Sequence, residues 1–368
     1  MSKIKDFIKQ ELTLIAAFAA ALISCFFVAP DKEYLSYIDV RTLALLFCLM
    51  VVVAGMRTAG IFASLAHSMC EKAGSIRAIC MLMVGLCFFS SMLITNDVAL
   101  LTFVPFAIVV LGMAHQTREL VRVVILQTVA ANLGSMLTPV GNPQNLYIYS
   151  YYNMSVSEFF SATVPIWLVS LLLIAAACFL FPKKEIDVFL GEKPDVDMRS
   201  LAVYAALFCV CMLVVFRVIE WQWMLLTVLA VLLVYDRKML LKADFMLLLT
   251  FVCFFIFAGN LTRIDTVRSI LENILSGHEL IAGTALSQVI SNVPAALLLS
   301  GFTGNAKALL LGVDIGGLGT PIASLASLIS LKLYMHAEYA DAKVFLAKFM
   351  LANFVLLAVL LPLGLLIA

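Results

Sequence analysis

Polar residues that could bind a solute or an ion interrupt two long apolar runs of the chain. Thr95, Asn96 and Asp97 stand in one run, and Ser291 and Asn292 stand in the other. Asparagine and serine side chains offer hydrogen-bond donors and acceptors without a charge. A carboxylate in apolar surroundings has to bind a proton or a cation. The two interruptions therefore predict a polar binding site with ion coupling.

Two stretches rich in proline and glycine break further apolar runs. The sequence TPVGNPQN covers Thr138 to Asn145, and GGLGTPIAS covers Gly316 to Ser324. Non-helical backbone inside a membrane is tolerated only where protein or a water-filled cavity satisfies its N–H and C=O groups. The N-termini of half-helices suit anions, whereas unwound carbonyls suit cations. The breaks are thus expected to surround a solute and its coupling ion.

We expect the two interruptions and the two breaks to share one site. The residues expected to bind the substrate are Thr95, Asn96, Thr138, Asn142, Asn145, Ser291, Asn292, Thr320 and Pro321. The residues expected around the coupling ion are Asp97, Asn132, Gly134, Ser135, Asp314, Gly316 and Gly317. The alternative for the small residues, and the better interpretation for Gly312 and Gly316, is close helix packing. The alternative for the aspartates is the capping of a half-helix.

The composition is that of a polytopic membrane protein. Of the 368 residues, 64% are hydrophobic and 13% are charged, and the mean hydropathy is +1.08. Runs of about 20 apolar residues, enough to span a bilayer core, recur from Leu12 to the C-terminus. The net charge of +1 argues against a nucleic-acid partner. Nine cysteines without a C-x-x-C pair are interpreted as small core residues, and the four histidines form no metal set.

Hydropathy divides the chain into two similar halves. In the first half we expect helices at 12–29 and 41–62, a hairpin at 78–113, a broken helix at 123–150 and a helix at 163–182. In the second half we expect helices at 200–216, 221–235 and 244–259, an amphipathic linker, a hairpin at 280–304, a broken helix at 308–335 and a helix at 344–367. The similar order of hairpin and broken helix indicates a repeat.

Basic residues orient these segments, because short cytoplasmic loops are enriched in lysine and arginine. Lys3, Lys5 and Lys9 place the N-terminus in the cytoplasm, and the crossings then place the C-terminus outside. Residues 1–182 and 200–368 are expected to form two inverted repeats, joined by a cytoplasmic linker at 183–199. The fold class is therefore an all-α membrane protein with inverted repeats, re-entrant hairpins and broken helices.

At these residues the chain resembles the ion transporter superfamily, which includes divalent-anion/sodium symporters, CitM-type citrate transporters, arsenite permeases and NhaD-type antiporters. The matching positions are Thr95-Asn96, Ser291-Asn292, Thr138-Pro139 and Thr320-Pro321. The resemblance implies an elevator movement, a homodimer, and sodium candidates at Asn96, Gly134, Asn292 and Gly317. Both tips lack the last threonine of the symporter pattern Ser-Asn-Thr. Asn96-Asp97 and GVDIGGLGTP are closer to the arsenite permeases, which are proton-coupled, and TPVGNPQN to the CitM-type permeases.

The expected function is secondary active transport of a small anion, a carboxylate or an inorganic oxyanion. Transport would cross a bacterial-type inner membrane by alternating access, driven by a proton or sodium gradient. The alternative is an arsenite efflux permease or a sodium/proton antiporter. An enzyme is not expected, because neither a nucleophile with a base nor an H-E-x-x-H zinc pair is evident. The expected partners are the solute and the lipid bilayer, and a sodium ion is the sole candidate cofactor.

Overall fold

The described residues of the computed structural model, 11–114, 116–185, 192–337 and 340–368, are almost entirely helical. Their one β-bridge joins Ser75 and Glu185. Seven helices within these ranges are long and apolar enough to cross a membrane. The prediction of an all-helical polytopic membrane protein is confirmed. Residues 1–10, with the three N-terminal lysines, and residues 186–191 of the expected linker lie outside the described residues.

The helices follow the order expected from hydropathy, with additional short elements. The helices of the first half are α2 (Leu12–Ser24), α3 (Tyr34–Tyr37), α4 (Val40–Thr58), α5 (Ile61–Glu71), α6 (Ile76–Ile94), α7 (Asn96–Met113), α8 (Thr117–Ser135), α9 (Pro143–Tyr151) and α10 (Val156–Cys178). Those of the second half are α11 (Met198–Val215), α12 (Trp221–Tyr235), η1 (Arg237–Lys242), α13 (Phe245–Thr262), α14 (Asp265–Leu275), α15 (Glu279–Ile290), α16 (Asn292–Leu299), η2 (Ser300–Phe302), α17 (Ala306–Ile315), α18 (Leu325–Tyr334) and α19 (Ala342–Ile367).

Each pair of hairpin helices meets at a single residue. Thr95 joins α6 to α7 with a φ of 67°, and Ser291 joins α15 to α16 with a φ of 76°. Both values lie in the left-handed region, which residues with a side chain rarely adopt. The following asparagines, Asn96 and Asn292, already belong to the second helix of each pair. Each turn therefore consists of one residue, and the rest of the polar interruption belongs to the helix that follows.

The two proline-containing stretches are breaks between helices. α8 ends at Ser135 and α9 begins at Pro143, while α17 ends at Ile315 and α18 begins at Leu325. Pro143 stands in the first turn of α9, where its missing N–H costs nothing, and Asn142 caps that helix through the N–H of Asn145. α8 begins six residues before the expected 123, because hydropathy does not register the polar first turn of a helix at a membrane surface.

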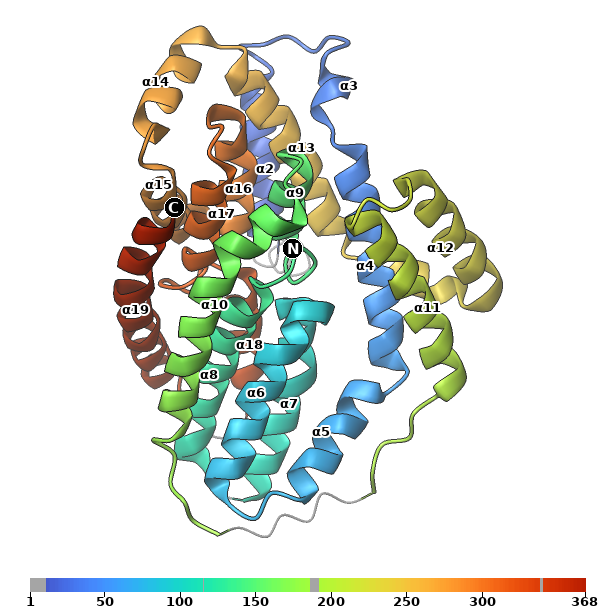
Figure 1. Ribbon diagram of the computed structural model, residues 1–368, viewed down its shortest axis with the longest axis vertical. Helices are drawn as coiled ribbons and strands as arrows, with labels where there is room; N and C mark the ends of the chain where they lie inside the picture. The colour runs from blue at the N-terminus through green and yellow to red at the C-terminus, as the bar shows by residue number, and fades with distance from the viewer. Residues whose placement is uncertain (1–10, 115, 186–191, 338–339) are drawn as a thin grey trace, which may run out of the picture.

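The hairpins and breaks form one group of helices, and the other long helices lie beside it. Figure 1 shows α6, α7, α8 and α18 in the lower part of the molecule and α9, α15, α16 and α17 in the upper part. α6 packs along α8, α15 packs along α17, and α18 crosses to contact α7 and α8. We call α6–α9 together with α15–α18 the hairpin group.

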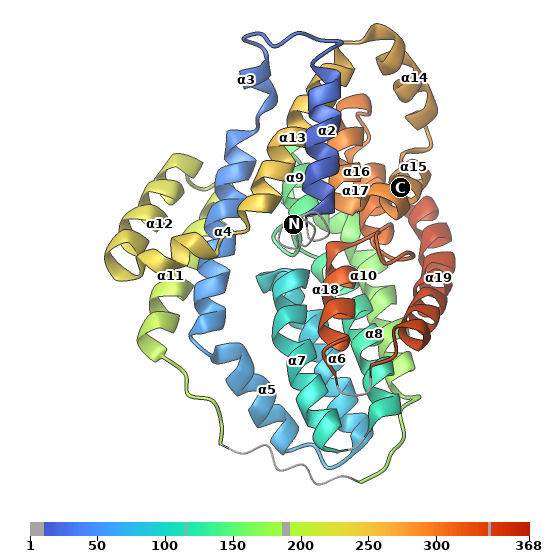
Figure 2. The ribbon, with the colours of Figure 1, turned by 180° about the vertical axis from the view of Figure 1, so that it is seen from behind.

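A second group consists of α2, α4, α11, α12 and α13, which we call the flanking group. Figure 2 shows α4, α11 and α12 to the left of the hairpin group, and α2 beside α13 in the upper middle of the molecule. Asn260 of α13 donates hydrogen bonds to Ser24 Oγ and Tyr34 OH, each at 2.9 Å. Gly55 of α4 lies against the ring of Tyr204 on α11, so that these helices approach closely.

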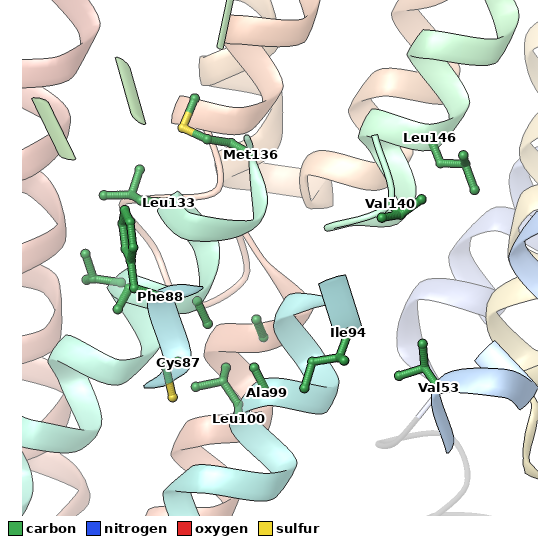
Figure 3. Close-up of a cluster of buried hydrophobic side chains, with 14 of the residues drawn as sticks. Val53, Cys87, Phe88, Ile94, Ala99, Leu100, Leu133, Met136, Val140 and Leu146 are labelled. Carbon is green, nitrogen blue, oxygen red and sulfur yellow. The ribbon is translucent and has the colours of Figure 1, made fainter. Parts of the chain in front are cut away.

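Buried apolar side chains fill the space beneath the first hairpin tip. Figure 3 shows Cys87 and Phe88 of α6, Ala99 and Leu100 of α7, and Leu133 of α8 around this space, all of them fully or almost fully buried. Six of the nine cysteines are buried and all are free, which agrees with their interpretation as core residues. The hairpin tip above this space therefore rests on a close-packed base.

Candidate functional site

Each hairpin tip is fastened to the break of its own half. The backbone N–H of Asn96 donates to Gly141 O at 3.1 Å, and that of Asn292 donates to Ala323 O at 3.0 Å. The Thr138 hydroxyl donates to Met92 O, and the Thr320 hydroxyl donates to Gln288 O. Met92 and Gln288 each stand three residues before their tip residue. The two Thr-Pro threonines, which we expected at the substrate, thus use their hydroxyls to hold the break on its hairpin.

Asn132 of α8 connects the two halves at the tips. Its Oδ1 accepts from Asn96 Nδ2 at 3.1 Å and from Ser324 Oγ at 3.0 Å, and its Nδ2 approaches Gly317 O at 3.4 Å. Asn292 Nδ2 also lies close to Gly317. The first tip, the first break and the second break therefore converge around one buried amide.

Asp314 is buried between the halves with one oxygen left over. It is 3% exposed, its Oδ1 accepts from Gln144 Nε2 at 3.2 Å, and its Oδ2 has no hydrogen-bond partner among the described residues. Asn145 Oδ1 and Asp97 Oδ1 are likewise buried without a partner there. Leaving a buried acceptor unsatisfied costs about 1–3 kcal/mol. The two carboxylate oxygens are therefore suited to bind a proton or a cation, and the amide oxygen of Asn145 is suited to coordinate a cation.

A cavity of about 100 Å³ lies between the two tips. Its polar lining residues are Glu11, Thr13, Asn96, Asp97, Gln144, Asp244, Thr250, Ser291, Asn292 and Ser324. A neighbouring cavity of about 220 Å³ shares Asp97 and Asp244 and adds Thr95, Asn142, Arg57 and Lys242. We call the first of these the central cavity. Among its described lining residues there are three carboxylates and no lysine or arginine.

Several expected site residues shape the breaks through hydrogen bonds within the chain. Ser135 Oγ accepts from Asn142 Nδ2 at 3.1 Å, and Asn145 Nδ2 donates to Met136 O and Thr138 O, both at 3.3 Å. These bonds satisfy carbonyls that the interrupted helix leaves free. Thr138, Asn145, Thr320 and Pro321 are not among the described residues that line the central cavity or its neighbour.

The glycines at the ends of α8 and α17 allow close contact with the hairpins. A Cβ on Gly134 would collide with Phe88 O and Ser91 Oγ, and a Cβ on Gly316 would lie 2.6 Å from Gly312 O and 2.8 Å from Ser287 Oγ. Close packing is thus the direct structural role of Gly316. Gly134 is nevertheless two residues from Asn132, and Gly316 is next to Gly317, so both glycines adjoin the hydrogen bonds at the tips.

Two glutamines of this region are not among the site residues expected from the sequence. Gln144 contacts Asp314, and Gln288 Nε2 donates to Gly316 O and Leu318 O, both at 2.9 Å, while Gln288 Oε1 accepts from Thr320 N at 2.9 Å. Gln288 thereby holds the second break by three hydrogen bonds. The signal that could have revealed it is a single amide inside the apolar run ALSQVI.

Comparison of the sequence with known proteins found membrane transporters that resemble this chain. The model of the citrate transporter family, CitMHS, matches residues 7–307. The chain is 34% identical over 307 residues to an uncharacterized transporter of Methanocaldococcus jannaschii, covering 82% of this chain and 83% of that protein. It is 32% identical over 318 residues to the inner membrane protein YbiR of Escherichia coli, covering 84% of each chain. The silicon efflux transporter LSI3 of Oryza sativa is 29% identical over 157 residues, which cover 42% of this chain and 32% of that protein.

Proposed function

The chain belongs to the citrate transporter family, and from this premise we propose that it moves a small anion, a carboxylate or an inorganic oxyanion, by alternating access. A proton or sodium gradient would drive the movement, and the membrane would be a bacterial-type inner membrane, as the name of the Escherichia coli relative YbiR suggests. The observation that carries the proposal is the central cavity, enclosed by Asn96 and Asn292 of two hairpin tips. No enzymatic activity is proposed.

The arrangement of the helices supports inverted repeats. α8 approaches the tips from the lower part of Figure 1 and α9 continues upward, whereas α17 approaches from the upper part and α18 continues downward. The equivalent hydrogen bonds of Asn96 and Asn292, and of Thr138 and Thr320, support the same relation. We therefore assign residues 1–182 and 200–368 to two repeats joined at 183–199. In an elevator movement, the hairpin group would slide against the flanking group.

The surroundings of each site residue suggest whether it would contact the substrate or the coupling ion. Asn96, Asn292, Ser291, Thr95 and Asn142 line the two adjoining cavities and would contact the solute. Asp97 and Asp314 carry unpartnered oxygens and would bind the coupling proton or sodium ion. A sodium ion takes oxygen ligands, and the tip amides together with the carbonyls at Gly317 and Gly134 are its other candidates.

One observation favours an arsenite-type permease as the second candidate function. The central cavity is lined by Glu11, Asp97 and Asp244 without a cation among its described lining residues. Such a lining repels a free anion but accepts an uncharged hydroxylated solute, or an anion that arrives with a cation. The partial match to a protein named as a silicon efflux transporter supports the same candidate. Transport of charge across proteoliposomes distinguishes the two, because an uncharged solute carries only the charge of its coupling ion.

Substitution of the two tip asparagines tests the proposed function. We expect Asn96→Ala and Asn292→Ala each to lower proteoliposome uptake of the transported solute at least tenfold. The screen would cover citrate, succinate, sulfate and arsenite, and folding would be followed by size-exclusion chromatography. Asn353→Ala is the matched control, since Asn353 is a fully buried amide on α19, outside the central cavity. Unchanged uptake in both tip variants would remove the tips from the site.

A further inference from the structure

A larger cavity of about 490 Å³ lies at the opposite ends of the helices that line the central cavity. We call it the outer vestibule, and its polar lining residues are Ser36, Tyr37, Asp39, Arg41, Tyr147, Ser150, Tyr151, Thr262 and Ser300. α9 contributes Gln144 to the central cavity and Tyr151 to the vestibule. These two residues are seven positions apart, or about 10 Å along a helix at 1.5 Å per residue.

Three further helices run from one cavity to the other. α13 lines the central cavity at Leu247 and Thr250 and the vestibule at Phe255 and Thr262. α16 begins at the tip and ends beside Ser300, and α4 lines the cavity next to the tips at its middle and the vestibule at Arg41. Figure 1 shows α3 and the end of α13 at the upper end of the molecule. The vestibule therefore lies in line with the central cavity, on the predicted outer side.

Arg41 gives the outer vestibule a positive charge that the described residues leave free. The Arg41 guanidinium forms no hydrogen bond or ion pair with them. Asp39, the one carboxylate among the described lining residues, caps the start of α4. It accepts hydrogen bonds from Thr42 N at 3.0 Å and from Thr42 Oγ1. Arg263, at the end of α13, differs in being paired with Asp31 at 2.8 Å. The Arg41 fork is thus available to a ligand.

Two hydroxyl groups complete the donor set. Ser150 and Tyr151 lie at the end of α9, and their hydroxyls make no hydrogen bond with the described residues. A guanidinium fork binds the oxygens of a carboxylate or oxyanion in a bidentate manner, and neighbouring hydroxyls can donate to the remaining oxygens. The vestibule therefore contains a cationic donor group, which the described lining of the central cavity does not have.

We propose that the outer vestibule is an anion-binding station in which Arg41, Ser150 and Tyr151 hold a small carboxylate or oxyanion. Its place on a transport path rests on the proposed function, whereas anion binding by Arg41 does not. The station would concentrate anions at one end of the path, before or after they pass the acidic central cavity.

Reaction rates of a reporter cysteine test the proposal in the full-length protein in lipid vesicles. Cys25, Cys209 and Cys253, the cysteines that are not fully buried, are first replaced by serine, and Thr262→Cys places a thiol in the vestibule. We measure the rates with an anionic and a cationic thiosulfonate of similar size. Arg41→Gln is expected to lower the anionic-to-cationic ratio about three- to tenfold, as expected for removal of one charge several ångströms away, and added salt should reduce the difference.

Protection experiments identify the class of anion. Citrate and inorganic sulfate are added at constant ionic strength with chloride. At least one of them is expected to slow modification of Thr262→Cys threefold or more, and Arg41→Gln should abolish this protection. Arg41→Lys is the matched control, because it keeps the charge and the rate ratio but loses the bidentate fork and therefore most of the protection. Ser36→Cys serves as a second reporter if Thr262→Cys does not fold.

An unchanged rate ratio in Arg41→Gln, or no protection by either anion, would overturn the proposal. These rates do not depend on transport. A protein that transports none of the screened solutes, yet shows the Arg41 effect, would therefore refute the proposed function and leave the anion station intact.

Discussion

At the scale of single residues, Asn132 and Asp314 occupy equivalent positions with different chemistry. Each stands six residues before the threonine of its Thr-Pro step. Asn132 has partners on both its oxygen and its nitrogen, whereas Asp314 retains an unpartnered oxygen. A neutral amide can thus serve as a fixed connector, while a buried carboxylate can change its charge by taking up a proton or a cation. Of this equivalent pair, only Asp314 has a group that could take part in the proposed ion coupling.

The residue-scale prediction concerns the two carboxylates. Asp314→Asn and Asp97→Asn remove the ionisable group while keeping the shape of the side chain. We expect each variant to remain folded and to lose the dependence of uptake on the imposed pH or sodium gradient. The measurement is solute uptake into proteoliposomes with and without each gradient. Asp341→Asn, at the exposed start of α19, is the control and should behave as the unmodified chain. An unchanged gradient dependence in both variants would reject the assignment.

At the scale of elements, the contact between α6 and α8 depends on the absence of a side chain at Gly134. A Cβ there would collide with the backbone of α6 at Phe88, whereas a Cβ on Gly85 in α6 would meet nothing within 4 Å. α6 leads from this contact to the tip of the first hairpin, and α8 leads from it to the first break. The spacing of the two helices therefore positions Asn96 and Asn132.

Substitution of these glycines tests the contact. Gly134→Ala should lower the free energy of unfolding by about 1–3 kcal/mol, because the extra methyl group forces the helices apart. Gly85→Ala should be neutral or slightly stabilising, since alanine favours the helix. Thermal unfolding in detergent compares the two. Equal melting temperatures for both variants would contradict the close approach of α6 and α8.

The hairpin group contains direct bonds between the halves, which would hold it together as one body in the proposed elevator movement. Thr128 of α8 donates to Ser330 of α18 at 2.7 Å, and both side chains are fully buried. By contrast, Tyr147 of α9 contacts Phe255 of the flanking group only through their rings, with centroids 5.7 Å apart. The first contact would persist during an elevator movement, and the second would break.

Cross-links at these two places give opposite expectations. A disulfide in the Thr128→Cys/Ser330→Cys double variant should leave solute uptake within about twofold of the reduced protein. A short bifunctional thiol reagent that bridges the Tyr147→Cys/Phe255→Cys double variant should stop uptake. Uptake before and after bridging is measured in the same vesicles. Arrest by both bridges, or by neither, would argue against a sliding hairpin group.

Some of these elements could be predicted from the sequence and others could not. Glycine, proline and asparagine inside apolar runs predicted the positions of the breaks and tips, because lipid tolerates such residues only where the chain needs them. The surface helices α3 and α5 were not expected, since their short amphipathic patterns do not register in hydropathy. The directions of the Thr138 and Thr320 hydroxyls, and the partners of Gln144 and Gln288, depend on tertiary packing that no local pattern contains.

At the scale of the whole molecule, the orientation in the membrane remains a prediction. Lys72, after α5, and His278, before α15, are both exposed. Each lies near the end of a hairpin that is remote from its tip. If the hairpins enter from opposite faces, the two positions lie on opposite sides of the bilayer. The positive-inside rule places Lys72 in the cytoplasm.

Labelling of single cysteines tests this orientation. Lys72→Cys should react with a membrane-impermeant thiol reagent only from the cytoplasmic side, and His278→Cys only from the outer side. Right-side-out and inverted vesicles supply the two directions of access, in a background in which Cys209 is replaced. Labelling of both positions from the same side would refute the inverted arrangement.

The length of α12 has a consequence for the surrounding lipid. Its 15 residues extend about 22 Å, which is several ångströms less than the hydrocarbon thickness of a typical bilayer. The bilayer beside this helix must become thinner to keep the polar ends of the helix out of the hydrocarbon, and the elastic cost rises as the lipids lengthen. Thickness-matched, short-chain lipids should therefore surround this edge of the protein, and longer chains should slow any motion that further increases the mismatch.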